Sequence, residues 1–160
     1  MHLKYDLPSI TIEGPQLGTT AVCTPILRSL PDWFGIEEAI VRYSSEIDRL
    51  PTFLACSAEQ IIGFQSLKQH SPYSAEVYVM GIQPEAQRRG IGRALMDAAQ
   101  VWLRKQGVEY LQVKTLGPSN GDSNYAKTRA FYMAVGFRPL EEFKQIWDEQ
   151  NPCLILVKRL

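Results

Sequence analysis

The chain has 160 residues, of which 45% are hydrophobic and 21% charged, and this is the composition of a globular protein long enough for one core. Its 17 basic and 17 acidic residues cancel at neutral pH, so bulk charge offers no case for a nucleic acid or a membrane surface as partner. We also find neither an apolar run of membrane-spanning length nor a signal-peptide core, and we expect a cytoplasmic protein.

The first third of the chain predicts one strand and two helices. Residues 8–13 alternate apolar and polar side chains, which predicts a strand. Residues 24–30 predict a short helix, with Thr24 as its N-cap and Pro25 at its first position. Apolar residues at helical spacing between Ile36 and Ile47 predict a second helix, which ends before a proline.

The middle of the chain predicts three strands and the main helix. Residues 52–57 and 60–68 read as a hairpin that turns at Ala58 and Glu59. Residues 75–83 form an apolar run that we interpret as the central strand. Apolar side chains then recur on one face of residues 90–105, which predicts an amphipathic helix.

The last third predicts a strand, a helix and a closing hairpin. The strand spans residues 109–115, and a loop rich in Gly, Ser, Asn and Asp follows it. The helix ends at Gly136, which suits a left-handed C-cap. Residues 142–147 and 153–158 then pair. This order predicts one α/β domain over residues 1–160, with a mixed, strongly twisted sheet flanked by helices.

The segment Gln-Arg-Arg-Gly-Ile-Gly at residues 87–92 joins the central strand to the main helix. A helix N-terminus presents unpaired backbone N–H groups and a partial positive charge, which together attract anions. Gly90 and Gly92 allow the backbone to approach a phosphate closely, and the neighbouring arginines add charge. A pyrophosphate is the expected ligand. The alternative is that this segment is an ordinary basic turn that caps a helix.

Two common phosphate motifs do not match this segment. A Walker loop needs a Lys-Ser/Thr pair that is missing here, and Leu95 stands where the dinucleotide fingerprint requires its third glycine. The pattern Gln-x-x-Gly-x-Gly after a strand instead resembles the acyl-CoA-binding motif of the GNAT acetyltransferase superfamily. Downstream, Phe131-Tyr132-x-x-x-Gly136-Phe137 is similar to the late helix of the same superfamily. The resemblance covers residues 52–160 well and is weak before them.

The resemblance implies an N-acetyltransferase that moves the acetyl group of acetyl-CoA to a primary amine by direct attack, and it implies the element order predicted above. Residues 87–94 would hold the pyrophosphate: Gln87, Arg88, Arg89, Gly90, Ile91, Gly92, Arg93 and Ala94. The backbone of Met80 and Ile82 would bind the pantetheine arm, beside a β-bulge for which Gly81 is the candidate. Relatives carry Asn at the offset of Tyr125, so Asn124 and Tyr125 are further candidate contacts, with Asn124 as a possible N-cap.

The resemblance also suggests two catalytic side chains. Tyr132 matches the tyrosine that protonates the leaving thiolate, and the alternative is a buried core aromatic. Glu76 matches the glutamate base of some members, and alternation puts it on one strand face with Tyr78 and Met80. The alternative for Glu76 is a solvated carboxylate at a strand edge.

The acceptor stays open between a small amine, a peptide N-terminus and a protein lysine. Aromatic candidates for its binding are Trp33, Phe34, Tyr73, Tyr78 and Trp147. Two other classes compete with the enzyme: a non-catalytic acyl-CoA sensor on the same fold, and a nucleotide-binding protein with an unusual phosphate turn. Three widely spaced cysteines and two isolated histidines predict free thiols and no metal site. A homodimer is a further possibility.

Overall fold

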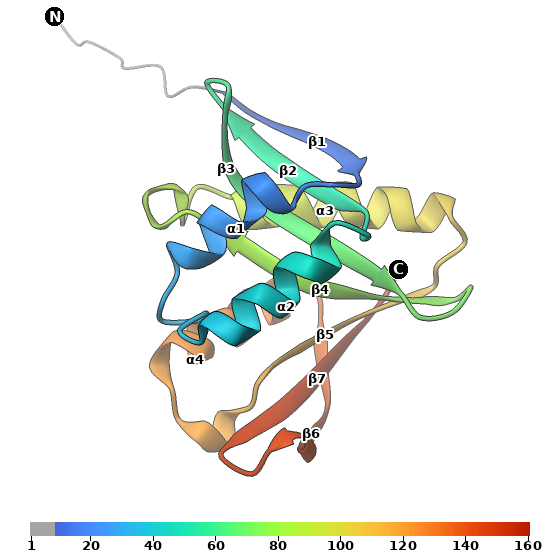
Figure 1. Ribbon diagram of the computed structural model, residues 1–160. Coiled ribbons are helices and arrows are strands. Elements are labelled where there is room, and N and C mark those ends of the chain that lie inside the picture. Colours follow the sequence, from blue (N-terminus) through green and yellow to red (C-terminus); the bar gives the residue numbers. More distant parts are fainter. Residues whose placement is uncertain (1–8) are drawn as a thin grey trace, which may run out of the picture.

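The computed structural model describes residues 9–160, and its seven strands form one sheet with the order β1-β2-β3-β4-β5-β7-β6. Only the β4–β5 pair is parallel. The predicted mixed α/β fold is confirmed (Figure 1). The elements are β1 Ile10–Gln16, α1 Thr20–Arg28, α2 Glu37–Ile47, β2 Thr52–Ser57, β3 Gln60–Gln69, β4 Ser74–Ile82, the 3-10 turn Pro84–Ala86, α3 Ile91–Lys105, β5 Tyr110–Leu116, the 3-10 turn Pro118–Asn120, α4 Ser123–Ala134, β6 Arg138–Asp148 and β7 Asn151–Arg159.

Helices cover both faces of the sheet and make two apolar clusters. Helices α1 and α2 bury Cys23, Ile26 and Leu27 against one face, together with Phe64 from β3. Helix α3 and the end of α4 lie on the other face, where the larger cluster extends from Phe53 to Leu156. Burial on this scale is the main favourable contribution to folding.

The first helix begins earlier than its local sequence predicts. Helix α1 starts at Thr20, so Thr24 and Pro25 lie inside it and do not open it. The reason is tertiary, because the backbone N–H of Thr20 donates to Asp48 Oδ1 at 3.1 Å and its hydroxyl donates to the carbonyl of Ser44 at 2.6 Å. The end of α2 therefore caps α1, which offsets the interior proline.

Other boundaries shift by a few residues. The predicted first strand begins in part outside the described residues, at Pro8, and β1 itself runs on to Gln16. Strand β6 starts at Arg138, earlier than expected, because β7 is long enough to pair with it there. The hairpin turn at Ala58 and Glu59 is confirmed, with φ values of 48° and 64° that a two-residue turn of the mirror-image type requires.

A β-bulge reverses the side-chain pattern of the central strand. Ser66 pairs with Val79 and Leu67 pairs with Val77, so Tyr78 is the extra residue of β4. Met80 consequently lies on the α3 face, and its predicted place beside Glu76 and Tyr78 is wrong. The predicted bulge at Gly81 is also wrong, because Gly81 pairs regularly with Phe64. A Cβ at Gly81 would come within 3.2 Å of the Ile26 and Phe64 side chains, which explains the glycine as a close packing contact.

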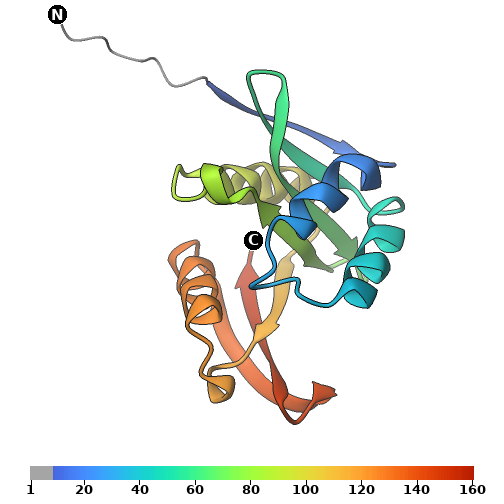
Figure 2. The same cartoon turned by 60° about the vertical axis from the view of Figure 1, so that its left-hand side comes forward.

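Strands β4 and β5 pair only at their beginnings. Their register runs from Ser74 opposite Tyr110 to Val77 opposite Val113 and stops there. Beyond that point β5 stays paired with β7, while β4 stays paired with β3. The part of the molecule that contains β5, β7, β6 and α4 accordingly splays away from the part that contains β1–β4 (Figure 2).

Candidate functional site

A cavity of about 1190 Å³ opens where β4 and β5 part. Residues from β4, β5, α3, α4, the segment between α1 and α2, and the β6–β7 hairpin line it. This volume is in the upper range for small-molecule sites, and a topological break in a sheet is a usual place for one.

The turn before α3 lines the cavity and contains two residues of positive φ. Arg88 has a φ of 62° and Gly90 a φ of 77°, so left-handed residues stand on both sides of Arg89. A turn of this kind can direct successive backbone N–H groups at an anion, an arrangement called a nest, and helix α3 begins directly after it at Ile91. A non-glycine residue in the left-handed region costs free energy, and such strain is concentrated at functional sites.

Most of the predicted phosphate contacts line this cavity. The lining residues are Gln87, Arg88, Gly90, Ile91, Gly92 and Arg93, whereas Arg89 and Ala94 are not among them. Gln87 Nε2 donates to the carbonyl of Ile82 at 3.2 Å, which ties the turn to the end of β4. A Cβ at Gly92 would lie 3.0 Å from the Phe131 ring and 3.2 Å from Met80 Cε, so this glycine brings α3 close to α4 and β4.

Met80 and Ile82 line the same cavity on the part of β4 that has lost β5 as a partner. The bulge at Tyr78 begins this unpaired stretch. Backbone groups on that side of the strand are therefore available to an extended ligand, as in recognition by strand addition.

Tyr132 lies on the inner side of α4 and also lines the cavity. Its side chain is 8% exposed, and its ring packs 5.4 Å from that of Phe131 and 5.6 Å from that of Phe137, centroid to centroid. Burial raises the pKa of its phenol, and nearby Tyr125 adds to the effect. Because its pKa is raised, the phenol stays protonated at neutral pH. Its hydroxyl makes no hydrogen bond with another residue in the described part of the chain, 9–160, so the proton is free to be donated.

The end of α4 fixes the position of this tyrosine. The Phe137 N–H donates to the carbonyl of Tyr132 at 3.0 Å, and the Gly136 N–H donates to the carbonyl of Met133 at 3.1 Å. These two bonds make a Schellman motif, for which Gly136 supplies a φ of 104°. The predicted role of Gly136 as a helix end is confirmed.

Glu76 does not line the cavity. Its carboxylate is buried in a polar cluster, where Oε1 is 2.7 Å from His70 Nε2, 3.3 Å from Gln112 Nε2 and 3.4 Å from Lys114 Nζ. The side chain is only 6% exposed, so the alternative of a solvated carboxylate is wrong. Lys114 does line the cavity, and it is the link between this cluster and the site.

Asn124 and Tyr125 both line the cavity at the start of α4. The N-cap of α4 is Asp122, whose Oδ1 accepts the N–H groups of Asn124 at 2.8 Å and Tyr125 at 3.2 Å, so the predicted cap at Asn124 is wrong. Tyr125 points its hydroxyl at the segment between α1 and α2, where it donates to the carbonyl of Trp33 at 3.0 Å. Trp33 Nε1 in turn donates to Thr128 Oγ1 at 3.0 Å. Two hydrogen bonds thus tie that segment to α4.

We expect Tyr125→Phe to lower the free energy of unfolding by about 1 kcal/mol at pH 7, because the Trp33 carbonyl loses its donor. Burial raises the pKa of Tyr125 to about 12, above the value of about 10 in an unfolded chain. A group with a raised folded pKa stabilises the protein below its unfolded pKa and ceases to do so as the pH passes the folded value. Denaturant unfolding should therefore show the deficit of the variant shrinking between pH 10 and 12. A deficit that is constant across this window would contradict the assignment.

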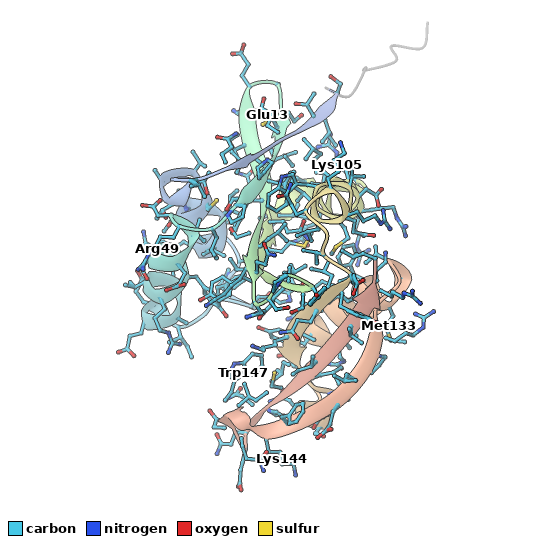
Figure 3. The ribbon with its side chains drawn as sticks, turned by 90° about the vertical axis from the view of Figure 1, so that its right-hand side faces the viewer. Glu13, Arg49, Lys105, Met133, Lys144 and Trp147 are labelled. Atoms are coloured by element: carbon cyan, nitrogen blue, oxygen red, sulfur yellow. The ribbon has the colours of Figure 1, made fainter. Side chains whose placement is uncertain are left out.

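Aromatic side chains form a part of the cavity lining that we call the aromatic wall. Phe34, Tyr43 and Tyr78 follow one another with ring centroids 5.7 and 5.6 Å apart. Trp33 and Trp147 also line the cavity, and Figure 3 shows Trp147 on the side of the β6–β7 hairpin nearer to α2. Tyr73 is not part of this wall, because it lies 62% exposed in the turn before β4.

Thr115 is a site residue that the sequence analysis missed. It is 3% exposed and lines the cavity from β5, yet its hydroxyl has no hydrogen-bond partner among residues 9–160. The signal was a threonine on the same strand face as Leu111 and Val113, both of which belong to the core. A hydroxyl among such neighbours is unusual without a partner.

The described part of the chain contains no group of three His, Cys, Asp or Glu side chains arranged for a metal ion. Within residues 9–160, no helix combines the length and the apolar character that a membrane crossing needs.

Comparison with known proteins gives one family. A sequence model of the acetyltransferase (GNAT) domain matches residues 48–139. The mycothiol acetyltransferase of Propionibacterium freudenreichii is 43% identical over 134 residues, which are 80% of this chain and 39% of that protein. The mycothiol acetyltransferase of Beutenbergia cavernae is 39% identical over 74 residues, which are 46% of this chain and 23% of that protein. The chain thus spans less than half the length of these curated relatives.

Solved structures share the fold at low sequence identity. A GNAT family acetyltransferase from Elizabethkingia anophelis with acetyl-CoA bound has a TM-score of 0.71 and 21% identity, covering 94% of this chain and 98% of that one. The ribosomal-protein-S18-alanine N-acetyltransferase from Escherichia coli has a TM-score of 0.75 and 19% identity, covering 94% of both chains.

Proposed function

Because this chain belongs to the GNAT acetyltransferase family, we propose that it transfers the acetyl group of acetyl-CoA directly to a primary amine. One observation supports this above the others: the turn before α3 and the side of α4 that carries Tyr132 line one and the same cavity. A site of this kind can hold a phosphorylated donor at one end and protonate a leaving group at the other.

The residues present fit acetyl-CoA. The amides of residues 88–93 and the side chains of Arg88 and Arg93 suit a pyrophosphate. The unpaired side of β4 at Met80 and Ile82 suits the peptide-like pantetheine arm. When bound, acetyl-CoA supplies a thioester that an uncharged amine can attack.

Two side chains are proposed to handle protons. Tyr132, whose pKa is raised by burial, keeps its proton at neutral pH and would give it to the leaving thiolate. Glu76 would receive the proton of the amine through water, because its carboxylate does not reach the cavity wall. His70, whose side chain is 36% exposed, would pass that proton on to bulk solvent.

Glu76→Gln is expected to lower kcat by about 100-fold, the usual size of a general-base contribution. The amide keeps the shape of the side chain but cannot bind the proton, and it also weakens the contact to Lys114. Steady-state rates should be measured together with denaturant unfolding. Gln112→Leu, which removes a different contact to Oε1, serves as the control for cluster disruption. A kcat within threefold of the wild type in Glu76→Gln would assign deprotonation to solvent alone.

The acceptor is proposed to bind between the aromatic wall and the β6–β7 hairpin. Phe34, Tyr43, Tyr78 and Trp147 offer ring faces to an apolar or cationic group. We retain small amines, peptide N-termini and protein lysines as classes, and we add the acetyl acceptor of the mycothiol acetyltransferases. The homodimer and the cytoplasmic location stay predictions.

Calorimetric titration with acetyl-CoA, CoA and ATP, followed by mass spectrometry of an amine panel, tests the proposed function. Micromolar binding of acetyl-CoA and an added acetyl group on one amine class would support it. Binding without transfer to any amine would favour the acyl-CoA sensor. Tighter binding of ATP than of either CoA species would overturn the proposal.

A further inference from the structure

Arg42 of α2 lines the cavity, and the reaction proposed above does not use it. The residues of α2 in the lining are Ala39, Arg42 and Tyr43, which have the i, i+3 and i+4 spacing of one helix face. The ring of Tyr43 lies 5.6 Å from that of Tyr78 on β4, so this face of α2 belongs to the aromatic wall. Tyr78 is roughly 13 Å of strand away from Ile82, where β4 ends and the turn toward α3 begins.

The guanidinium of Arg42 has no acidic partner in the part of the chain that the structure describes. Glu38 and Glu46 stand four positions away on either side, a spacing that allows an ion pair, but none of the ion pairs among residues 9–160 includes Arg42. Glu46 pairs instead with Lys68, at 3.8 Å. Nor does Arg42 pair with any of the aspartates that line the cavity, which are Asp32, Asp122 and Asp148. Its planar fork of N–H donors is therefore available to a carboxylate.

The charges around Tyr43 indicate what kind of acceptor fits. Burial raises the pKa of the Tyr43 phenol, while Arg42 opposes this shift and Glu76 adds to it, so both charges lie near the same side chain. Glu76 already has a cation beside it, because Lys114 Nζ is 3.4 Å from its Oε1. Arg42 is thus a positive charge without a counter-ion, close to the group proposed to receive the proton of the amine. A negative group that it binds would lie close to that amine.

We propose that Arg42 binds a carboxylate of the acceptor, which is then an amino acid or another small molecule that carries a carboxylate next to its primary amine. This inference rests on the function proposed above. A peptide N-terminus and a protein lysine have an amide or an alkyl chain in that place, so Arg42 selects the small amines among the three acceptor classes. The rings of Phe34, Tyr43 and Tyr78 suit an apolar side chain on the same molecule.

Steady-state rates with L-phenylalanine and L-phenylalanine amide test this inference, because the two probes differ only in the carboxylate. Loss of the carboxylate also lowers the pKa of the neighbouring amine, so each variant is compared with the wild type on the same probe. Arg42→Gln removes the charge, and Arg42→Lys keeps the charge without the planar fork. Arg49→Gln is the matched control, since Arg49 lies just beyond the end of α2 and does not line the cavity.

Arg42→Gln should raise the KM of L-phenylalanine by about tenfold, the loss of one charge-assisted pair, and leave kcat within about twofold. The KM of the amide should stay within about twofold of the wild-type value, because the amide has no charge to lose. Arg42→Lys should give a smaller increase for L-phenylalanine, and Arg49→Gln should match the wild type on both probes. Calorimetry should give the same Kd of acetyl-CoA for all four proteins, because Arg42 is not assigned to the donor.

Equal changes in the KM of both probes, or weaker binding of acetyl-CoA by Arg42→Gln, would overturn the assignment of Arg42 and leave the proposed function intact. A wild-type protein that acetylates only amines without a carboxylate would do the same. A wild-type protein that binds acetyl-CoA and acetylates no amine would overturn the proposed function. Titration of the CoA-bound protein with L-phenylalanine then decides separately for Arg42, which is supported only if Arg42→Gln weakens that binding.

Discussion

Tyr132→Phe should lower kcat by about 100-fold, equivalent to about 2.7 kcal/mol of transition-state stabilisation, while the Kd of acetyl-CoA changes less than threefold. The hydroxyl is the group proposed to protonate the leaving thiolate, and the ring stays in place. Phenylalanine preserves the contacts to the Phe131 and Phe137 rings. Because the tyrosine hydroxyl has no hydrogen bond to any residue between 9 and 160, its removal should not lower the free energy of unfolding.

The measurement separates chemistry from folding and binding. Single-turnover rates report the chemical step, calorimetry reports the Kd, and denaturant unfolding reports stability. Tyr110→Phe is the matched control, since Tyr110 is 46% exposed on β5 and does not line the cavity. A Tyr132→Phe variant with more than half of the wild-type kcat would show that water protonates the thiolate.

The pH dependence of the wild-type rate follows from the same group. Burial raises the pKa of Tyr132 above its usual value of about 10, so the acid form persists through the neutral and mildly alkaline range. An amine acceptor gains reactivity as it loses its proton, so kcat/KM should rise with pH. No descending limb is expected below about pH 10, and one centred near pH 8 would exclude Tyr132 as the acid.

Gly90→Asp should weaken acetyl-CoA binding by about 100-fold, or about 3 kcal/mol, relative to Gly90→Asn. Gly90 has a φ of 77°, and Asn and Asp are the side chains that best tolerate this conformation. A Cβ built at Gly90 meets no heavy atom within 4 Å, so neither variant should clash, and both carry the same backbone strain of the left-handed conformation. The pair differs by one negative charge beside the proposed pyrophosphate.

Calorimetry at two salt concentrations completes this test. The difference in the Kd of acetyl-CoA between the two variants should be smaller at high salt, because exposed charges are screened. Equal Kd values of acetyl-CoA for the Asp and Asn variants would show that the pyrophosphate does not bind at the nest. Gly107→Asp is a control for the charge alone, because Gly107 also has a positive φ, of 84°, and lies in open space at the other end of α3.

Local sequence was sufficient to predict the glycine turn before α3, the end of α4 and most elements. Gly90 and Gly136 lie at chain positions where only a backbone of positive φ continues the fold, and this requirement is visible in the sequence itself. The hairpin at Ala58 and Glu59 and the helices at α2 and α3 likewise follow from periodicity over a few turns or residue pairs.

The remaining features depend on contacts between distant segments, which no local pattern encodes. Asp48 extends α1 back to Thr20 from 28 residues away. The bulge at Tyr78 comes from the register between β3 and β4, and one extra residue is enough to send Met80 to the opposite face. The Tyr125 hydroxyl donates to the carbonyl of Trp33, which is 92 residues away in the sequence. The residues that line the cavity also depend on distant contacts. Lys114 of β5 holds Glu76 in a polar cluster away from the cavity. Thr115, whose hydroxyl has no partner among the described residues, lines the cavity because β4 and β5 stop pairing before it.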